Sequence, residues 1–354
     1  MRKRISSNDV AKLAGVSRAT VSYVLNGSST QTIPETTKKK VLDAAEKLGY
    51  FPNRQARTLK TKKTDCICVM ICQNIEMPGP AATLQGIRKV LNEHGYTILL
   101  SSNARREDKP YPEYIHSYLE SYCDGIILLG YDLGTGFEEY IDVIRKFQIP
   151  FLMINPERFY DEFYSVAGEK WTGQEEIIRI SASEGYREFI YIFPDHLTDR
   201  EKERMENYLS MCREKGYTCR TAEFPMKIDV RLSSIKKGSD DDYQKTVKYA
   251  EGIRQIDELV KGKEQEICFV VPWQQMAASL MTFFTGKENK PAIAVLSGAS
   301  PDISLYAVYG GKILFLDMQF MKCGEAAAQK MIRILEGGAI EQHTVIPAAV
   351  LEFN

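Results

Sequence analysis

Apolar residues in the first 50 positions repeat with the spacing of short helices. They are Val10, Leu13 and Ala14, then Val21, Val24 and Leu25, and then Val41, Ala44, Ala45 and Leu48. Gly15, Gly27 and Gly49 follow the three stripes, and Ser17 offers an N-cap between the first two. The pattern predicts three short helices. The first two, joined by a tight turn, form a helix-turn-helix, whose second helix fits the major groove of DNA.

From Asp65 onward, short apolar runs alternate with helical patterns. The predicted strands span 66–72, 96–101, 125–130, 150–154, 188–193, 217–223, 267–271, 292–297 and 343–351. The predicted helices span 81–94, 111–122, 136–147, 171–184, 200–215, 242–261, 274–285 and 321–336. This alternation is typical of doubly wound parallel sheets, and the region is long enough for two lobes. We expect a ligand to bind between them, at the carboxyl ends of the strands.

Charge divides the chain at the same place. Residues 1–64 hold 14 Lys and Arg against 4 Asp and Glu, a net charge of +10. The rest hold 32 against 43, a net charge of −11, so the formal total of −1 hides two opposite halves. Because a basic face attracts phosphates, we expect the helical end to bind nucleic acid.

Composition excludes several classes of protein. The chain has no run of 18 apolar residues, and a polar stretch follows its basic first four residues, so neither a membrane span nor a secretory signal is predicted. Eight cysteines are too sparse for a disulfide scaffold and favour reduced thiols in a cytoplasm. The sequence leaves two interpretations of Cys66, Cys68 and Cys72, a metal site and a buried strand. The absence of a CxxC motif or a nearby His favours the strand.

Catalytic motifs are absent from the sequence. We find no GxSxG, no P-loop, no HExxH and no GxGxxG after a predicted strand. The four histidines, His94, His116, His196 and His343, have no metal-ligand spacing. We therefore expect no catalytic residue, metal or cofactor. His196, close after a predicted strand, is a weak candidate for ligand contact.

Two stretches of the basic end resemble the headpiece of the LacI/GalR family of transcriptional regulators. They are 9–27, DVAKLAGVSRATVSYVLNG, and 44–53, AAEKLGYFPN, followed by Ala56 and Leu59. The resemblance implies a recognition helix at 17–25 and, at 53–60, a hinge helix that orders on operator DNA. The implied DNA-binding residues are Ser17, Arg18, Ala19, Thr20, Ser22, Tyr23, Asn26, Asn53, Ala56 and Leu59.

The same resemblance implies separate roles for these residues. Arg18 and Ala19 match positions that read base edges, and Leu59 matches an apolar wedge in the minor groove. The positions matched to phosphate contacts are Ser17, Thr20, Ser22 and Asn26. Tyr23 stands where the family usually has Arg. Because tyrosine cannot make a forked contact to guanine, the base preference at that position stays open.

The acidic part resembles, more loosely, the periplasmic-binding-protein-like core of the same family. The best local matches are 123–128, 149–154 and 324–327. The fold implied is a small all-α helix-turn-helix headpiece (1–50), a hinge and linker (51–64), and an α/β core (65–354) of two doubly wound lobes. The chain would cross between lobes near 163, 317 and 340. The N-lobe would then hold about 65–163 and 318–339, and the C-lobe about 164–317 and 340–354.

The effector site carries over from the family only in part. The candidate effector-binding residues are Gln73, Met77, Arg204, Trp273 and Gln274. Arg204 matches an arginine that holds effector hydroxyls or carboxylates. The alternative, an ordinary solvent-exposed arginine on a helix, is equally favoured by the sequence. Trp273 and Gln274 stand where the family usually has Asn-Asp, and Leu296-Ser297-Gly298-Ala299 replaces a second acidic position. The effector is therefore a sugar or sugar derivative held differently, another small molecule, or none.

These observations predict a sequence-specific transcriptional regulator, most simply a repressor, located in the cytoplasm at the nucleoid. We expect a homodimer on double-stranded operator DNA, because the last predicted strand runs almost to Asn354 with no heptad tail for tetramers. A small molecule in the core cleft would control operator affinity. Control by a protein partner or a degenerate pocket is the alternative, and an enzyme or a plain binding protein is less favoured.

Overall fold

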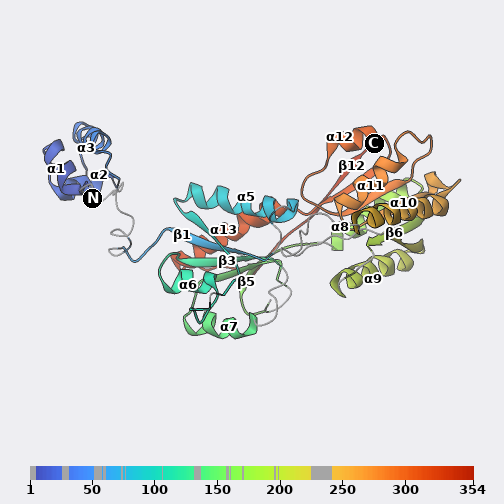
Figure 1. The fold of residues 1–354 in the computed structure, drawn as a ribbon, viewed down its shortest axis with the longest axis horizontal. Helices are drawn as coiled ribbons and strands as arrows, with labels where there is room; N and C mark the ends of the chain where they lie inside the picture. Colours follow the sequence, from blue (N-terminus) through green and yellow to red (C-terminus); the bar gives the residue numbers. More distant parts are fainter. Residues whose placement is uncertain are drawn as a thin grey trace. The chain divides into compact units, whose positions relative to one another are not determined.

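The chain forms two compact units, Met1–Thr64 and Asp65–Asn354, here called the headpiece and the core (Figure 1). The computed structural model describes residues 5–25, 32–51, 58, 61–72, 75, 77–105, 107–130, 137–156, 159, 161–169, 171–194, 197, 199–224 and 241–354. The unit boundary coincides with the change in net charge along the sequence.

Three helices make up the described headpiece. They are α1 (Ser7–Ala14), α2 (Arg18–Leu25) and α3 (Glu35–Leu48). Each contributes one fully buried valine, Val10, Val21 and Val41, to a shared apolar core. The predicted helix-turn-helix with a third helix is confirmed.

Local chemistry fixes the ends of these helices. At the start of α1, the backbone N–H and the hydroxyl of Ser6 both donate to the Asp9 carboxylate, at 2.9 and 2.6 Å. Gly15 and Gly49, with φ of 66° and 62°, end α1 and α3 in the left-handed conformation that glycine adopts without steric cost. The tight turn between α1 and α2 follows from Gly15.

The N-lobe of the core is a six-stranded sheet in the order β11-β5-β4-β3-β1-β2, with every pairing parallel. Its strands are β1 (Cys66–Ile71), β2 (Thr97–Ser101), β3 (Gly125–Leu129), β4 (Phe151–Ile154), β5 (Tyr164–Gly168) and β11 (His343–Ile346). Its helices are α5 (Pro78–Glu93), α6 (Glu113–Leu119), α7 (Phe137–Lys146) and α13 (Phe320–Glu336). Figure 1 shows α5 and α13 on one face of this sheet and α6 and α7 on the other.

The C-lobe is a second six-stranded sheet, in the order β12-β10-β9-β8-β6-β7. Its strands are β6 (Glu188–Pro194), β7 (Thr218–Phe224), β8 (Ile267–Val271), β9 (Ala292–Gly298), β10 (Ile313–Asp317) and β12 (Ala349–Phe353). Its helices are α8 (Trp171–Ser183), α9 (Asp199–Glu214), α10 (Asp241–Val260), α11 (Gln274–Phe284) and α12 (Ile303–Tyr309), with a 3₁₀ turn at Glu264–Glu266. The β10–β12 pairing is antiparallel and the others are parallel.

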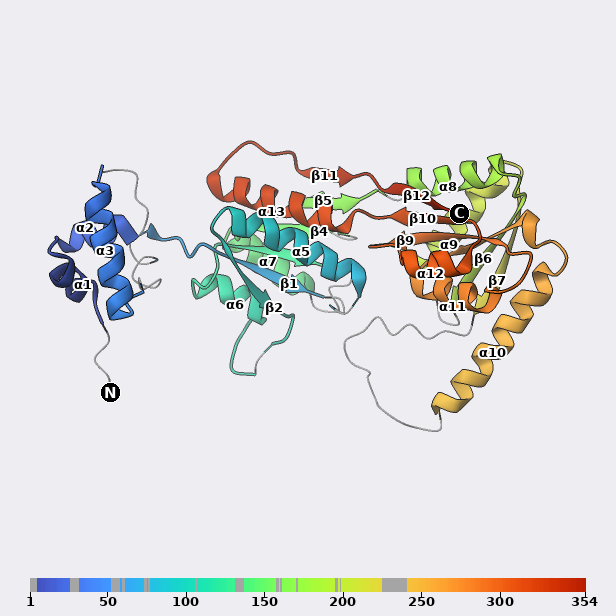
Figure 2. The ribbon, with the colours of Figure 1, turned by 90° about the horizontal axis from the view of Figure 1, so that it is seen from above.

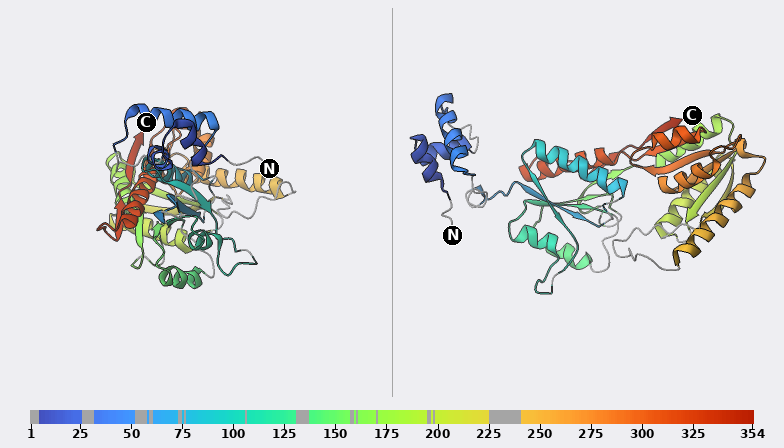
Figure 3. Two further views of the ribbon diagram at one scale, coloured as in Figure 1. Left: turned by 90° about the vertical axis from the view of Figure 1, so that its left-hand side faces the viewer. Right: turned by 45° about the horizontal axis from the view of Figure 1, so that its top comes forward.

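Both sheets are covered on their two faces, so each lobe has three layers (Figure 3). In β1, Ile67 and Val69 cluster with α5 and α13, whereas Cys68 and Met70 cluster with α6 and α7. In the C-lobe, α10, α11 and α12 cover one face and α8 and α9 the other. The prediction of two doubly wound α/β lobes is confirmed.

The cysteine-rich segment is a buried strand. Cys68 has no exposed surface in β1, and the strand interpretation of this segment is correct. Across the part of the chain that the structure describes, no group of three or more His, Cys, Asp or Glu could hold a metal ion. In the same part, no helix combines the length and apolar character needed to cross a bilayer.

Two of the expected crossings between lobes are misplaced. The chain leaves the N-lobe after β5, returns after β10 and leaves again after β11, which puts 164–168 and 343–346 in the N-lobe sheet. The predicted strand 343–351 is in fact two strands in different sheets, joined at Pro347 (Figure 2). Proline breaks the run because it has no backbone N–H to donate. β10 of the C-lobe ends at Asp317, and α13, which packs on the N-lobe sheet, begins at Phe320.

Two glycines let α5 and α13 cross at very short range. A Cβ on Gly86 would lie 2.0 Å from the carbonyl oxygen of Met321, and one on Gly324 would lie 2.0 Å from the carbonyl oxygen of Thr83. Only residues without a Cβ allow the two helix backbones to approach so closely. The crossing fixes the start of α13, which contributes Phe320 and Cys323 to the ligand pocket described below.

Candidate DNA-binding helix and ligand pocket

The outer face of α2, together with Ser17 just before it, carries six of the residues predicted to contact DNA. Buried Val21 turns one side of the helix toward α1 and α3 and leaves the other side outward. Ser17, Arg18, Ala19 and Ser22 are exposed, and Thr20 and Tyr23 are half-buried. The second helix of a helix-turn-helix thus presents a polar face with no large apolar side chain fully exposed on it, which suits the edges of base pairs.

Two of these residues also make contacts within the headpiece. The Ser17 hydroxyl accepts from the backbone N–H of Thr20 at 3.1 Å and caps the start of α2. Arg18 Nε donates to the Ser7 hydroxyl at 3.2 Å. This contact orients the guanidinium and leaves its other N–H groups for a base or phosphate.

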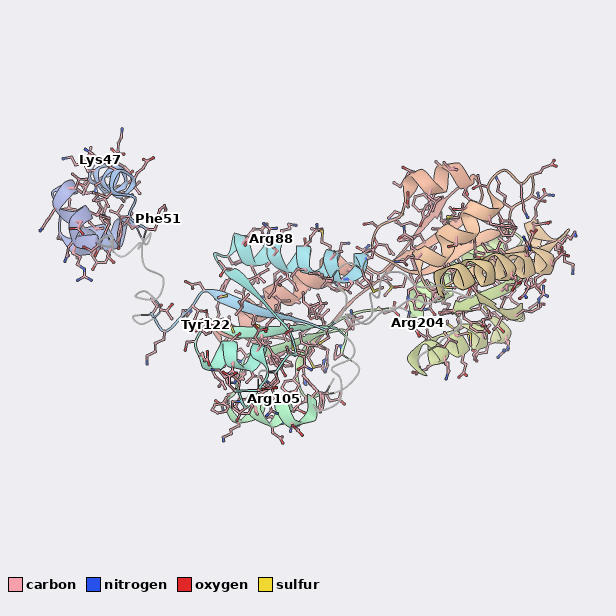
Figure 4. The ribbon with its side chains drawn as sticks, in the orientation of Figure 1. Lys47, Phe51, Arg88, Arg105, Tyr122 and Arg204 are labelled. Atoms are coloured by element: carbon pink, nitrogen blue, oxygen red, sulfur yellow. The ribbon has the colours of Figure 1, made fainter. Side chains whose placement is uncertain are left out.

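Lysines on α3 add positive charge to the headpiece. Lys38 Nζ is paired with Glu35 Oε1 at 2.5 Å, whereas Lys39 and Lys40 are exposed. Lys47, near the other end of the helix, is also exposed (Figure 4). Such lysines supply sequence-independent attraction to phosphates.

Several predicted residues lie outside the described part of the chain. They are Asn26, Asn53, Ala56 and Leu59 of the DNA-binding set, Gln73 of the effector set, and His196. Their roles stay predictions.

A hollow lies between the two lobes, at the carboxyl ends of their strands. It is lined by Asn155, Gly168, Arg204, Leu296, Ser297, Met318, Phe320 and Cys323. Its volume is about 330 Å³, including space open to solvent.

Arg204, in the second turn of α9, is the one charged residue among those lining residues. Figure 4 labels it where α9 begins. Among the residues that the structure describes, no carboxylate pairs with its guanidinium. Burial raises the pKa of Tyr191, and the nearby Arg204 charge opposes that rise. A cation among the lining residues that has no carboxylate partner in the described part of the chain is available to a ligand oxygen.

The other polar groups of the pocket can also donate hydrogen bonds. Asn155, at φ 52°, follows β4, and its Oδ1 accepts from the backbone N–H of Gly168 at 2.8 Å. Because the amide oxygen is used, the amide nitrogen is left to donate. Ser297 adds a hydroxyl at the end of β9. With Arg204, these groups suit a ligand rich in acceptor oxygens.

The rest of the lining is apolar. Leu296, Met318 and Phe320 are apolar residues, and burial raises the pKa of the Cys323 thiol to about 11, so it stays protonated near neutral pH. The pocket therefore pairs one donor-rich side with one apolar side, as small-molecule sites commonly do.

Of the predicted effector residues that the structure describes, only Arg204 lines the hollow. Met77 precedes α5 and Trp273 precedes α11, where Trp273 packs against the C-lobe core. Gln274 is the first residue of α11. The residues that line the hollow do not include Met77, Trp273 or Gln274.

Sequence reasoning missed several lining residues, among them Asn155, Gly168, Met318 and Phe320. Asn155 directly follows the predicted strand 150–154, so its place at a strand end was a usable signal. Gly168 ends a strand that was not predicted, and Met318 and Phe320 follow another.

Comparison with known proteins gives a consistent result. Residues 8–53 match the family model described as bacterial regulatory proteins, lacI family. The chain is 27% identical to catabolite control protein A of Priestia megaterium over 274 residues, which are 77% of this chain and 75% of that protein. It is 30% identical to the HTH-type transcriptional regulator RegA of Clostridium saccharobutylicum over 234 residues, 65% of this chain and 66% of that protein.

The fold has close counterparts among solved structures. The chain is similar to the lac repressor in a dimer bound to operator and the anti-inducer ONPF, with a TM-score of 0.69 and 17% identity. The similarity covers 99% of this chain and 98% of the other, and therefore includes the headpiece and both lobes. By its matched headpiece, its relatives and its fold, the chain belongs to the LacI/GalR family of transcriptional regulators.

Proposed function

We propose that this protein is a sequence-specific DNA-binding repressor of transcription, controlled by a small molecule in the pocket between its lobes. The observation that carries the proposal is the outward polar face of α2 on a basic helix-turn-helix headpiece. Binding to operators would place the protein at the nucleoid, in the cytoplasm. No catalytic role is proposed, since the relatives compared above are regulators.

Operator binding as a homodimer is part of the proposal. The lac repressor, which shares the fold, is a dimer on its operator in the structure compared above. Two headpieces related by two-fold symmetry would read a near-palindromic site. Arg18 would contact a base edge and the α3 lysines would contact phosphates.

Control by the ligand requires that it bind one lobe arrangement better than another. The pocket lining comes from both lobes, with Asn155 on one side and Arg204 on the other. A ligand that bridges them therefore has different contacts whenever the lobes move, and it shifts operator affinity only by that difference. The donor-rich lining supports a small molecule with hydroxyl, carboxylate or phosphate oxygens, of which a sugar derivative is one.

Genome-wide footprinting followed by binding to the recovered site tests the DNA-binding role. We expect a steep negative slope of log affinity against log salt, because several phosphates are neutralised. Arg18→Ala should cost about 1–3 kcal/mol on the recovered site and little on random DNA. Lys39→Ala, the matched control, should weaken both equally. A flat salt slope would refute the proposal.

Thermal stabilisation of the full chain by small molecules tests whether a small molecule controls the protein. A panel chosen from the genes next to the recovered operator should contain a stabilising compound whose effect is lost in Arg204→Ala. If a protein from the same cells changes operator affinity and no small molecule does, control by a protein partner replaces control by a small molecule.

A further inference from the structure

Two cysteines of the C-lobe lie in one layer, between the sheet and α9. Cys219 on β7 is in register with Phe189 on β6, and paired residues of parallel strands face the same side. Both belong to the cluster on the α8 and α9 face of the sheet, which also holds Cys212 from the last turn of α9. The backbone N–H of Tyr217 donates to the carbonyl oxygen of Cys212 at 3.0 Å and closes the turn that joins them.

The two thiols differ in exposure. Cys212 has no exposed surface, whereas Cys219 is partly exposed at an edge strand of the sheet. Interaction with Cys212 lowers the pKa of Cys219, burial opposes this lowering, and the charge of Arg213 adds to it. Interaction with Cys219 and burial both raise the pKa of Cys212. Oxidation-sensitive cysteines are accessible, have a low pKa and often lie beside a second thiol.

We propose that Cys219 and Cys212 form a peroxide-responsive thiol pair, with Cys219 as the residue oxidised first. The Cys219 thiolate attacks hydrogen peroxide, the O–O bond breaks, and Cys219 becomes a sulfenic acid while hydroxide leaves and takes up a proton as water. The Cys212 sulfur then attacks the Cys219 sulfur. The S–O bond breaks, a disulfide forms, and the oxygen leaves as water with the thiol proton. Two thiols are oxidised and one peroxide is reduced to two waters.

A second pair in the same chain provides an internal control. Cys68 and Cys123 also lie in one cluster, but they are 0% and 3% exposed in the N-lobe. Because peroxide must reach the attacking sulfur, proximity without access should leave this pair reduced. The pairs thus separate the effect of exposure from that of contact.

Peptide mapping of the reduced full-length protein after treatment with hydrogen peroxide tests the proposal. Cleavage after Lys and Arg puts Cys212 in the peptide 205–213 and Cys219 in 216–220, each with a single cysteine. We expect a disulfide-linked mass of these two peptides, with linkage at least about tenfold above that between Cys68 and Cys123. Equal linkage of both pairs, or none at 212 and 219, overturns the proposal.

Single variants test the order of the two steps. Cys212→Ser should leave a Cys219 sulfenic acid that the reagent dimedone traps on peptide 216–220. Cys219→Ser should leave Cys212 unmodified at the same peroxide concentration. Cys219→Ala, whose fold is checked by circular dichroism, should behave like Cys219→Ser. Dimedone trapping on Cys212 in either Cys219 variant would show that the assigned order is wrong.

Discussion

The crossing of α5 and α13 makes Gly86→Ala a strong test of the structure. The added Cβ would lie 2.0 Å from a backbone oxygen and 2.9 Å from a backbone nitrogen of α13. Backbone atoms cannot rotate away as a side chain does, so the helices must separate by more than an ångström. Overpacking costs about 3 kcal/mol and the better helix propensity of alanine returns about 1 kcal/mol, which leaves a net loss of about 2 kcal/mol.

Urea unfolding followed by circular dichroism measures this loss. Gln85→Ala is the matched control, since Gln85 is adjacent and exposed and should leave stability within about 0.5 kcal/mol. Gly324→Ala should cost as much as Gly86→Ala, because its Cβ strikes the same crossing from the other helix. The double variant should cost less than the sum, since one separation relieves both contacts. Wild-type stability in Gly86→Ala, or strict additivity, would refute this reasoning.

Three further predictions concern the DNA-binding and ligand-binding regions. Ser17→Ala removes the cap of α2 and should destabilise that helix by about 1 kcal/mol. Hydrogen exchange should then be faster at the backbone amide of Thr20, and an unchanged exchange rate would contradict the prediction. Arg204→Ala should abolish the ligand response and retain operator affinity, whereas Arg213→Ala on the same helix should retain both; loss of operator binding would make Arg204 structural. Leu59→Ser, at a position outside the described residues, should weaken specific DNA binding far more than non-specific binding, and equal losses would exclude a wedge.

Periodicity was sufficient for elements with clear ends. Each headpiece helix has an apolar stripe, and the first and third end at a glycine, so their number and order are predictable. Short strands were harder. β5 has a single fully buried apolar residue between polar or small neighbours, Val166, and so lacks a strand signature. The apolar run of β10 lies just before a helix and has no period of its own.

The pocket was less predictable than the fold, because its lining is assembled from positions far apart in the sequence. Arg204 was found through a family match at one position. The family resemblance also points to Trp273, but this side chain packs partly against the C-lobe core, and the size of a tryptophan does not show which side it faces. Asn155 takes its place through a left-handed backbone and a bond to Gly168 on the next strand, neither of which periodicity reveals.

The passage of residues 343–353 from one sheet to the other affects how the protein is made. β11 completes the edge of the N-lobe sheet and β12 that of the C-lobe sheet, and Pro347 lies between them. The headpiece can fold as soon as its own residues leave the ribosome. Neither lobe has its full set of strands until this last stretch has been synthesised. During translation, a folded headpiece is therefore attached to a core whose two sheets each still have an unpaired edge strand. Because unpaired edges are prone to aggregation, chaperones are needed most during this period.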